Sequence, residues 1–241
     1  MKKLLFLAVA IVLIIGLVVL NVNKKYERNL KRLEQDTIEL SFMPQPATEV
    51  DSIEFESNWI LHETMWLENI AGVEQILVAF YEVSEGRIKF ILQDKHGFYD
   101  LGMEGRPEDV VVLAKDINKD GSSELLISVN QGATVKEVKI FTYKGEQWLS
   151  LLDGENFIDV DLDEDGISEI VETSMGSLPG YTYLYRWNGG QFEKSDLMKD
   201  SGYDHVAFVI KQNKPVFELV KGNIVQIYAY QKGKLEVVLG K

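Results

Sequence analysis

The sequence predicts an all-β fold, a small β-propeller-like array of about four blades preceded by one N-terminal transmembrane helix. Three observations support this prediction: an apolar run near the N-terminus, an internal repeat of 45 to 49 residues, and alternating hydrophobic segments joined by turns within each repeat. No convincing helical period follows residue 36. We expect the blades to form a closed ring of four or five, with an open array completed by a partner as the alternative.

The N-terminal apolar run is predicted to be an uncleaved membrane anchor. Leu4–Val22 contains 19 residues without a charge, which span about 28 Å as a helix, close to the thickness of a bilayer core. No small-x-small cleavage site follows, so residues 1–23 read as a signal anchor. Basic residues are more numerous after the run, which favours a cytoplasmic C-terminus. Because Lys2 and Lys3 form a short basic start, we nevertheless expect a single-pass plasma-membrane protein with its C-terminal domain outside the cytoplasm.

Residues 24–49 are predicted to form a juxtamembrane helix and a proline linker. Leu30 and Leu33 have helical spacing among alternating charges, and two prolines between Met43 and Ala47 favour extended backbone. Two flanking segments alternate like strands and are candidates to complete a blade: Thr37–Phe42 and Val50–Phe55.

A repeat organises residues 50–241. Asp116–Glu124 matches Asp161–Glu169 at the acidic or amide positions 1, 3, 5 and 9, with an offset of 45 residues. The equivalent positions of the four units, spaced 49, 45 and 49 residues apart, are Gln75, Glu124, Glu169 and Glu218. Each unit also contains a strand, a polar turn and a second strand, so about four strands fill each unit, as in a propeller blade. The predicted units are about 50–108, 109–154, 155–204 and 205–241.

Two loops in the middle units carry a pattern suited to a hard cation. Oxygen-bearing side chains at positions 1, 3, 5 and 9 converge on one centre, and a glycine at position 6 permits the tight turn. Ligation by oxygen alone favours Ca²⁺ over transition metals. The predicted ligands, including the carbonyl groups of Ser122 and Ile167, are Asp116, Asn118, Asp120, Ser122 and Glu124 in the first loop, and Asp161, Asp163, Asp165, Ile167 and Glu169 in the second.

The loops and the strand–turn–strand tails that follow them resemble the FG-GAP/VCBS-type repeat. This repeat is the calcium-loop blade of integrin α-subunit propellers and of many bacterial surface proteins. The resemblance covers roughly residues 66–241, with specific motifs in the two middle units and degenerate ones in the outer two. It implies that the loop positions hold Ca²⁺ and that each unit is a propeller blade.

Other interpretations of the loops remain open at this stage. Surface turns rich in Asp, Asn and Gly that hold no ion are one alternative. An EF-hand is another, because Asp161–Glu172 fits its generic pattern, but Ile127 replaces the last ligand of the other loop and the flanks look like strands. The outer units lack the motif, so neither is expected to bind an ion.

Composition excludes several classes of function. The net charge of -13 is uneven, because residues 1–35 carry seven basic and two acidic side chains, which leaves -18 on the remainder. A domain with this much negative charge repels phosphate backbones, so we expect no nucleic-acid partner. The absence of cysteine excludes disulfides, thiolate metal sites and a cysteine nucleophile.

No catalytic constellation is evident, so we expect a protein that is not an enzyme. His62, His96 and His205 each stand alone in their segments, and no nucleophile elbow, phosphate-binding loop or dinucleotide fingerprint occurs. The sequence therefore predicts a membrane-anchored, calcium-binding interaction module that has the membrane and an unknown protein or glycan as partners. The alternatives are a cell-envelope hydrolase with active residues on blade-top loops, and a structural subunit completed by a partner chain.

A row of aromatic side chains is the candidate recognition surface. Tyr181, Tyr183, Tyr185 and Trp187 occupy alternate positions, so they share one face of a strand. Such side chains suit either packing between blades or contact with a ligand, and the sequence does not distinguish the two.

Overall fold

The computed structural model of the 241-residue chain describes residues 36–84, 87–132, 134–174 and 180–238. The chain divides into two compact units, Met1–Ile38 and Glu39–Lys241. The predicted anchor (residues 1–23) and the helix predicted to follow it lie outside the described residues. Within the described part, none of the helices has both the length and the apolar character needed to cross a membrane.

The described residues form four antiparallel sheets of five strands each, which confirms the all-β class. Four strands of each sheet are consecutive in the chain. The first sheet contains β5 (Ile60–Ile70), β6 (Val73–Ser84), β7 (Arg87–Gln93) and β8 (Phe98–Glu104), and the second contains β9 (Val110–Lys115), β10 (Glu124–Asn130), β11 (Lys136–Lys144) and β12 (Gln147–Glu155). The third contains β13 (Phe157–Val160), β14 (Glu169–Thr173), β15 (Thr182–Trp187) and β16 (Phe192–Asp196), and the fourth contains β17 (His205–Lys211), β18 (Lys214–Lys221), β19 (Ile224–Gln231) and β20 (Lys234–Val237).

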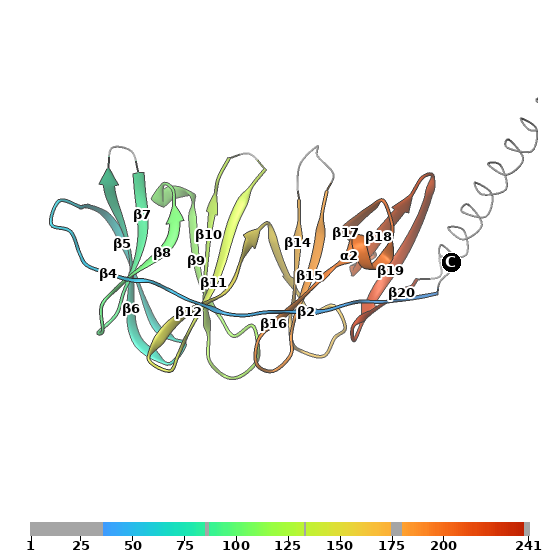
Figure 1. Ribbon diagram of the computed structural model, residues 1–241, viewed down its shortest axis with the longest axis horizontal. Helices are drawn as coiled ribbons and strands as arrows, with labels where there is room; N and C mark the ends of the chain where they lie inside the picture. Colours follow the sequence, from blue (N-terminus) through green and yellow to red (C-terminus); the bar gives the residue numbers. More distant parts are fainter. Residues whose placement is uncertain (1–35, 85–86, 133, 175–179, 239–241) are drawn as a thin grey trace, which may run out of the picture. The chain divides into compact units, whose positions relative to one another are not determined.

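The fifth strand of every sheet comes from one extended segment near the N-terminus. Its strands are β1 (Thr37–Glu39), β2 (Met43–Gln45), β3 (Thr48–Glu49) and β4 (Ser52–Ile53). They pair, in that order, with β20, β16, β12 and β8, so the segment visits the sheets from the fourth to the first. We call residues 39–53 the strap; in Figure 1 it is the blue segment that crosses all four sheets.

Backbone and side-chain contacts hold the strap along its length. The Leu40 N–H donates to the Gly233 carbonyl (3.1 Å), and the Arg186 guanidinium lies 4.0 Å from the centre of the Phe42 ring. The Val50 N–H donates to the Trp148 carbonyl at 2.9 Å. Residues 43–49, where the sequence analysis placed a linker, thus form β2 and β3.

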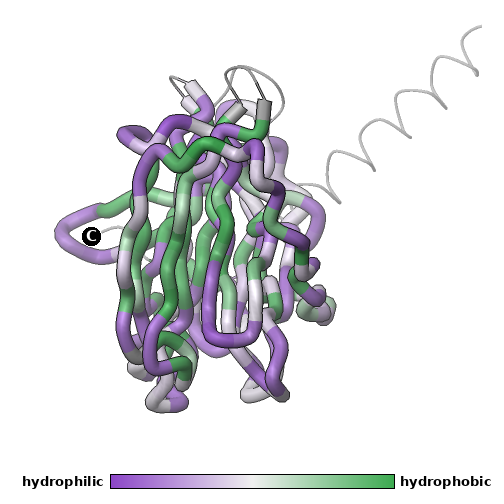
Figure 2. Tube along the Cα trace, turned by 90° about the vertical axis from the view of Figure 1, so that its left-hand side faces the viewer, coloured by the Kyte–Doolittle hydropathy of each residue, from purple (hydrophilic) through white to green (hydrophobic). Residues whose placement is uncertain are grey.

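The four sheets stand in a row, with the first and fourth at its two ends (Figure 1). The expected closed ring is therefore not formed. The strands are largely hydrophobic and the turns hydrophilic (Figure 2), because neighbouring sheets bury their faces against each other. The buried clusters between sheets include Phe80, Phe90, Leu125 and Phe141 between the first and second, and Ile140, Leu152, Ile170 and Tyr185 between the second and third.

The outer face of the first sheet is covered by the segment that follows the strap. Phe55 packs edge-on against Trp59 and Tyr81, with ring centroids 5.8 and 5.4 Å apart. Ala79 and Ile91 are buried beneath this aromatic cluster. The first sheet therefore ends the row with a face that its own chain covers.

A short helix, α2 (Leu197–Ser201), joins the third and fourth sheets where the sequence showed no helical period. The Asp196 carboxylate caps it by accepting the Lys199 N–H, and Gly202 ends it in the left-handed region with φ 70°. Five residues are too few to show a helical period of apolar residues, so only these capping residues indicated the helix in the sequence.

Truncating a buried strap residue is expected to destabilise the whole domain. Val50 is 8% exposed and belongs to the core between the first two sheets. Replacing Val50→Ala removes the equivalent of two methylene groups and lowers the free energy of unfolding by about 2 kcal/mol. The exposed strap variant Thr48→Ala should change it by less than about 0.5 kcal/mol. Chemical denaturation measures both, and equal effects would show that the strap is not part of the core.

Candidate metal centre

The two predicted cation loops occupy equivalent places in the second and third sheets. The first loop connects β9 to β10, and the second connects β13 to β14, so in each the final glutamate is the first residue of the second strand. Both loops repeat the same backbone conformation. Lys119 and Glu164 have φ values of 59° and 60°, and Gly121 and Gly166 both have 90°. Left-handed backbone at the sixth position explains the glycine.

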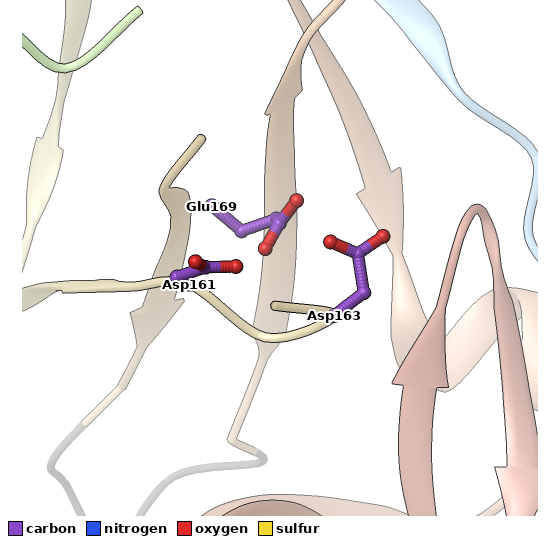
Figure 3. A group of neighbouring side chains, drawn as sticks. All are labelled: Asp161, Asp163 and Glu169. Carbon is purple, nitrogen blue, oxygen red and sulfur yellow. The ribbon is translucent and has the colours of Figure 1, made fainter. Parts of the chain in front are cut away.

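In the second loop three carboxylates converge. Atoms of Asp161, Asp163 and Glu169 all lie within 4.8 Å of one another, and their side chains approach the same region from the loop and from β14 (Figure 3). Asp165 lies outside this group and accepts the Ile167 N–H at 2.8 Å. The structure therefore brings together three of the four predicted side-chain ligands.

The first loop shares three internal hydrogen bonds with the second loop and has one amide in place of a carboxylate. Glu124 accepts the Ile117 N–H at 2.9 Å, as Glu169 accepts the Leu162 N–H at 2.9 Å. Asp116 accepts the Gly121 N–H, and Asp120 accepts the Ser122 N–H. The amide of Asn118 donates to Glu124 at 3.0 Å, which offsets part of the negative charge. The carbonyl groups of Ser122 and Ile167 remain predicted ligands.

The terminal glutamates of both loops are buried among other acids. Glu124 is 1% exposed and Glu169 is 4% exposed. Burial, followed by the charges of Asp120 and Asp116, raises the pKa of Glu124 to about 7. Burial, followed by the charges of Asp163, Asp165 and Asp161, raises the pKa of Glu169 to about 8. Backbone hydrogen bonds oppose both shifts without cancelling them.

Each loop also leaves a buried carboxylate oxygen without a hydrogen-bond partner, Asp116 Oδ1 in the first and Asp163 Oδ1 in the second. No ion pair seen among the described residues involves Glu124 or Glu169. Buried acceptors are normally satisfied, and buried charges are normally paired. The oxygen-only donor set, its orphaned atoms and its uncompensated charge fit a divalent hard cation.

The repeat position of Glu124 and Glu169 is occupied differently in the first and fourth sheets. Glu218, in register with Glu169, forms an ion pair with the Lys211 ammonium group. Gln75 holds the position in the first sheet and carries no charge. Lys211 was not predicted as the partner of Glu218, because the strand pattern alone does not reveal that β17 carries this lysine toward β18. Among the residues that the structure describes, the acids of the two middle units in this register therefore have no basic partner, unlike Glu218.

Both loops contact a neighbouring sheet. In the first loop Ser123 forms an isolated parallel bridge with Ile70, and its carbonyl accepts the Ala71 N–H at 2.7 Å. In the second loop Asp163 Oδ2 accepts the Lys232 N–H, from the turn between β19 and β20, at 3.1 Å. Sequence reasoning found neither contact, since both depend on how the sheets pack. The loops join the first sheet to the second and the third to the fourth.

The aromatic row is mainly an element of sheet packing. The Tyr185 hydroxyl donates to Glu172 at 2.6 Å, and Tyr185 and Trp187 contact the core between the second and third sheets. Tyr181 stacks on Tyr183 with ring centroids 4.8 Å apart. Tyr185 is buried and the other three side chains are partly buried. The structure thus places the row between sheets, as the first of the two interpretations expects.

The histidines lie apart on different elements. The His62 ring lies 2.9 Å from Glu82 on the neighbouring strand, His96 stacks on Tyr143, and His205 begins β17. This placement offers no observation in favour of the hydrolase alternative.

The sequence matches no protein family model, and it matches no curated protein. The resemblance to FG-GAP/VCBS repeats therefore stays a prediction.

The raised glutamate pKa values predict an unusual pH dependence of the ion-free protein. A carboxyl group with a folded pKa near 7 or 8 and an unfolded pKa near 4.3 binds more protons when folded, so stability falls as pH rises between these values. We expect the thermal midpoint in chelator to fall from pH 5 to pH 8. Glu169→Gln should reduce this fall, whereas Glu164→Gln should leave it unchanged. A midpoint that is independent of pH in this interval would show that the glutamates are ionised throughout.

Proposed function

We propose that the protein is a membrane-anchored extracytoplasmic binding module whose row of sheets is stabilised by two Ca²⁺ ions. The observation that carries the proposal is the pair of buried glutamates, Glu124 and Glu169, which have no basic partner in the described part of the chain and lie in loops with matching left-handed positions. Where a lysine is present in the equivalent register, as at Glu218, the acid is already compensated. In the two middle loops a bound cation would supply this compensation once the glutamates are ionised.

The residues that would hold the ions are those that the loops present. Asp161, Asp163, Asp165 and Glu169 supply the second site, and Asp116, Asn118, Asp120 and Glu124 supply the first. A bound Ca²⁺ ion supplies two positive charges and accepts oxygen ligands with flexible geometry. The second site has one negative charge more, so it should bind more tightly than the first.

Calcium at these positions would strengthen contacts between sheets. The first loop bridges to Ile70 and the second to Lys232, so ordering a loop also orders the packing of its neighbour. At about 1 mM Ca²⁺ and a Kd of about 0.1 mM, each site would contribute about 1.4 kcal/mol to stability. Millimolar Ca²⁺ occurs outside cells, which agrees with an extracytoplasmic domain.

Calcium is expected to raise the thermal midpoint of the full chain at pH 9, which lies above the pKa values of both glutamates. Glu169→Gln should remove most of the response of the second site because it deletes a buried ligand charge. Glu164→Gln removes one charge from the same loop without removing a predicted ligand and is the matched control. Scanning calorimetry with Ca²⁺, Mg²⁺ or chelator measures the shifts. An equal shift in both variants, or none in the parent protein, would contradict calcium binding at this loop.

The membrane orientation can be tested with single cysteines, because the chain has none of its own. Lys95 is exposed in the turn between β7 and β8, and Lys3 precedes the predicted anchor. A membrane-impermeant maleimide should label Lys95→Cys in intact cells and Lys3→Cys only after lysis. The opposite pattern would place the domain in the cytoplasm and remove the argument from extracellular calcium.

A further inference from the structure

Each sheet has one edge covered by the strap and one edge that pairs with no described strand. The second kind of edge is formed by β5, β9, β13 and β17. An unpaired edge exposes backbone donors and acceptors to any chain that can add a strand, and proteins usually protect such edges with charges, irregular register or short length.

Strand β9 has few of these protections, because its one charged residue, Lys115, lies at its end. Val110–Ala114 contains no charged or polar side chain, and Val111 and Leu113 are 45% and 54% exposed. Its pairing with β10 is regular over six residues. It is therefore a flat, apolar edge that can accept another strand.

The other three edges are less suited to pairing. Strand β5 carries His62, Glu63 and Glu68, and its register with β6 shifts between Leu61 and Glu63. Strand β13 has only four residues and includes Asp159. Strand β17 is apolar in its middle, but pairing with its own copy about Phe208 would place Lys211 opposite His205, which disfavours association.

The sequence around β9 is complementary to itself in the antiparallel direction. If two copies pair about Val112, Leu113 lies opposite Val111 of the other chain, and Ala114 lies opposite Val110. Lys115 then approaches Asp109 of the other chain, and the same contact occurs twice by symmetry. A two-fold interface requires this self-complementarity in both side-chain size and charge.

An apolar groove beside β9 extends the same surface. It has a volume of about 180 Å³ and lies between the second and third sheets. Val111 and Leu113 line it together with Leu126, Phe157 and Ile170. Residues that pair directly across two strands share one face of the sheet. In the antiparallel pair, Val111 and Leu113 of the second copy would continue this apolar lining.

We propose that β9 is a self-association edge, at which a second copy of this chain adds its own β9 in antiparallel register about Val112. The two second sheets then form one continuous sheet of ten strands. Lys115 and Asp109 already contact Asp159 and Arg106 within one chain, so the charges at each end of the interface become shared networks. The proposal is independent of cation binding at the loops.

Disulfide trapping tests the register directly. Val111→Cys and Leu113→Cys are prepared in full-length chains with different tags, mixed in mild detergent and oxidised. In the proposed register the two positions are opposite each other, within disulfide range, whereas two copies of position 111 are roughly 8 Å apart. The mixed pair should therefore cross-link several-fold more than either variant alone. Val111→Cys mixed with Ile210→Cys, an exposed position on β17, measures cross-linking by random collision.

Charge reversal provides a second readout that does not depend on cysteine reactivity. Lys115→Asp or Asp109→Lys alone should reduce the dimeric fraction measured by light scattering, and the doubly reversed chain should restore it. Thermal melts show that each variant is folded. A mixed cross-link no stronger than the collision control, a dominant link between two copies of position 111, or no recovery in the double variant would overturn the proposal.

Discussion

Edge pairing by the strap is the constraint on which the rest of the structure depends. Four sheets packed face to face would each leave two rows of unpaired backbone groups at their edges. One extended segment pairs with part of one edge in every sheet, and its side chains enter the cores, as Val50 does between the first two sheets. The strap therefore links the sheets into one cooperative unit, whereas the consecutive strands alone would form four separate sheets.

The negative charge of the two acidic loops weakens the packing between sheets unless a cation compensates that charge. The loops lie where neighbouring sheets touch, and the second loop places the carboxylates of Asp161, Asp163 and the buried Glu169 within 4.8 Å of one another. In the fourth sheet, Lys211 supplies the compensating charge from within the chain. In the middle sheets a compensating charge must come from a proton or a bound ion. The proposed calcium sites thus follow from electrostatics as much as from the spacing of ligands.

Much of the fold could be predicted from local patterns. The alternation of apolar residues predicted the strands, and the offset of 45 residues between Asp116 and Asp161 predicted loops that share one conformation. The prediction of a closed ring was wrong, because the arrangement of the sheets depends on side-chain packing that no local pattern encodes. Strands of two or three residues, such as β3 and β4, are too short to show a period. At the site, the convergence of Asp161, Asp163 and Glu169 agreed with the pattern, but the contact of Asp163 with Lys232 depended on tertiary structure.

The reversed order of the strap has a consequence for synthesis of the chain. The strap leaves the ribosome before any of its partners, yet it pairs with the last sheet at its beginning, and Ser41 bonds to Asp200 across 159 residues. Contacts of such sequence separation form late and slow folding. The first strap residues therefore remain unpaired until the C-terminal strand β20 has been synthesised. A chain truncated before β20 would leave the beginning of the strap exposed. This exposed segment would distinguish an incomplete chain from a finished one for cellular quality control.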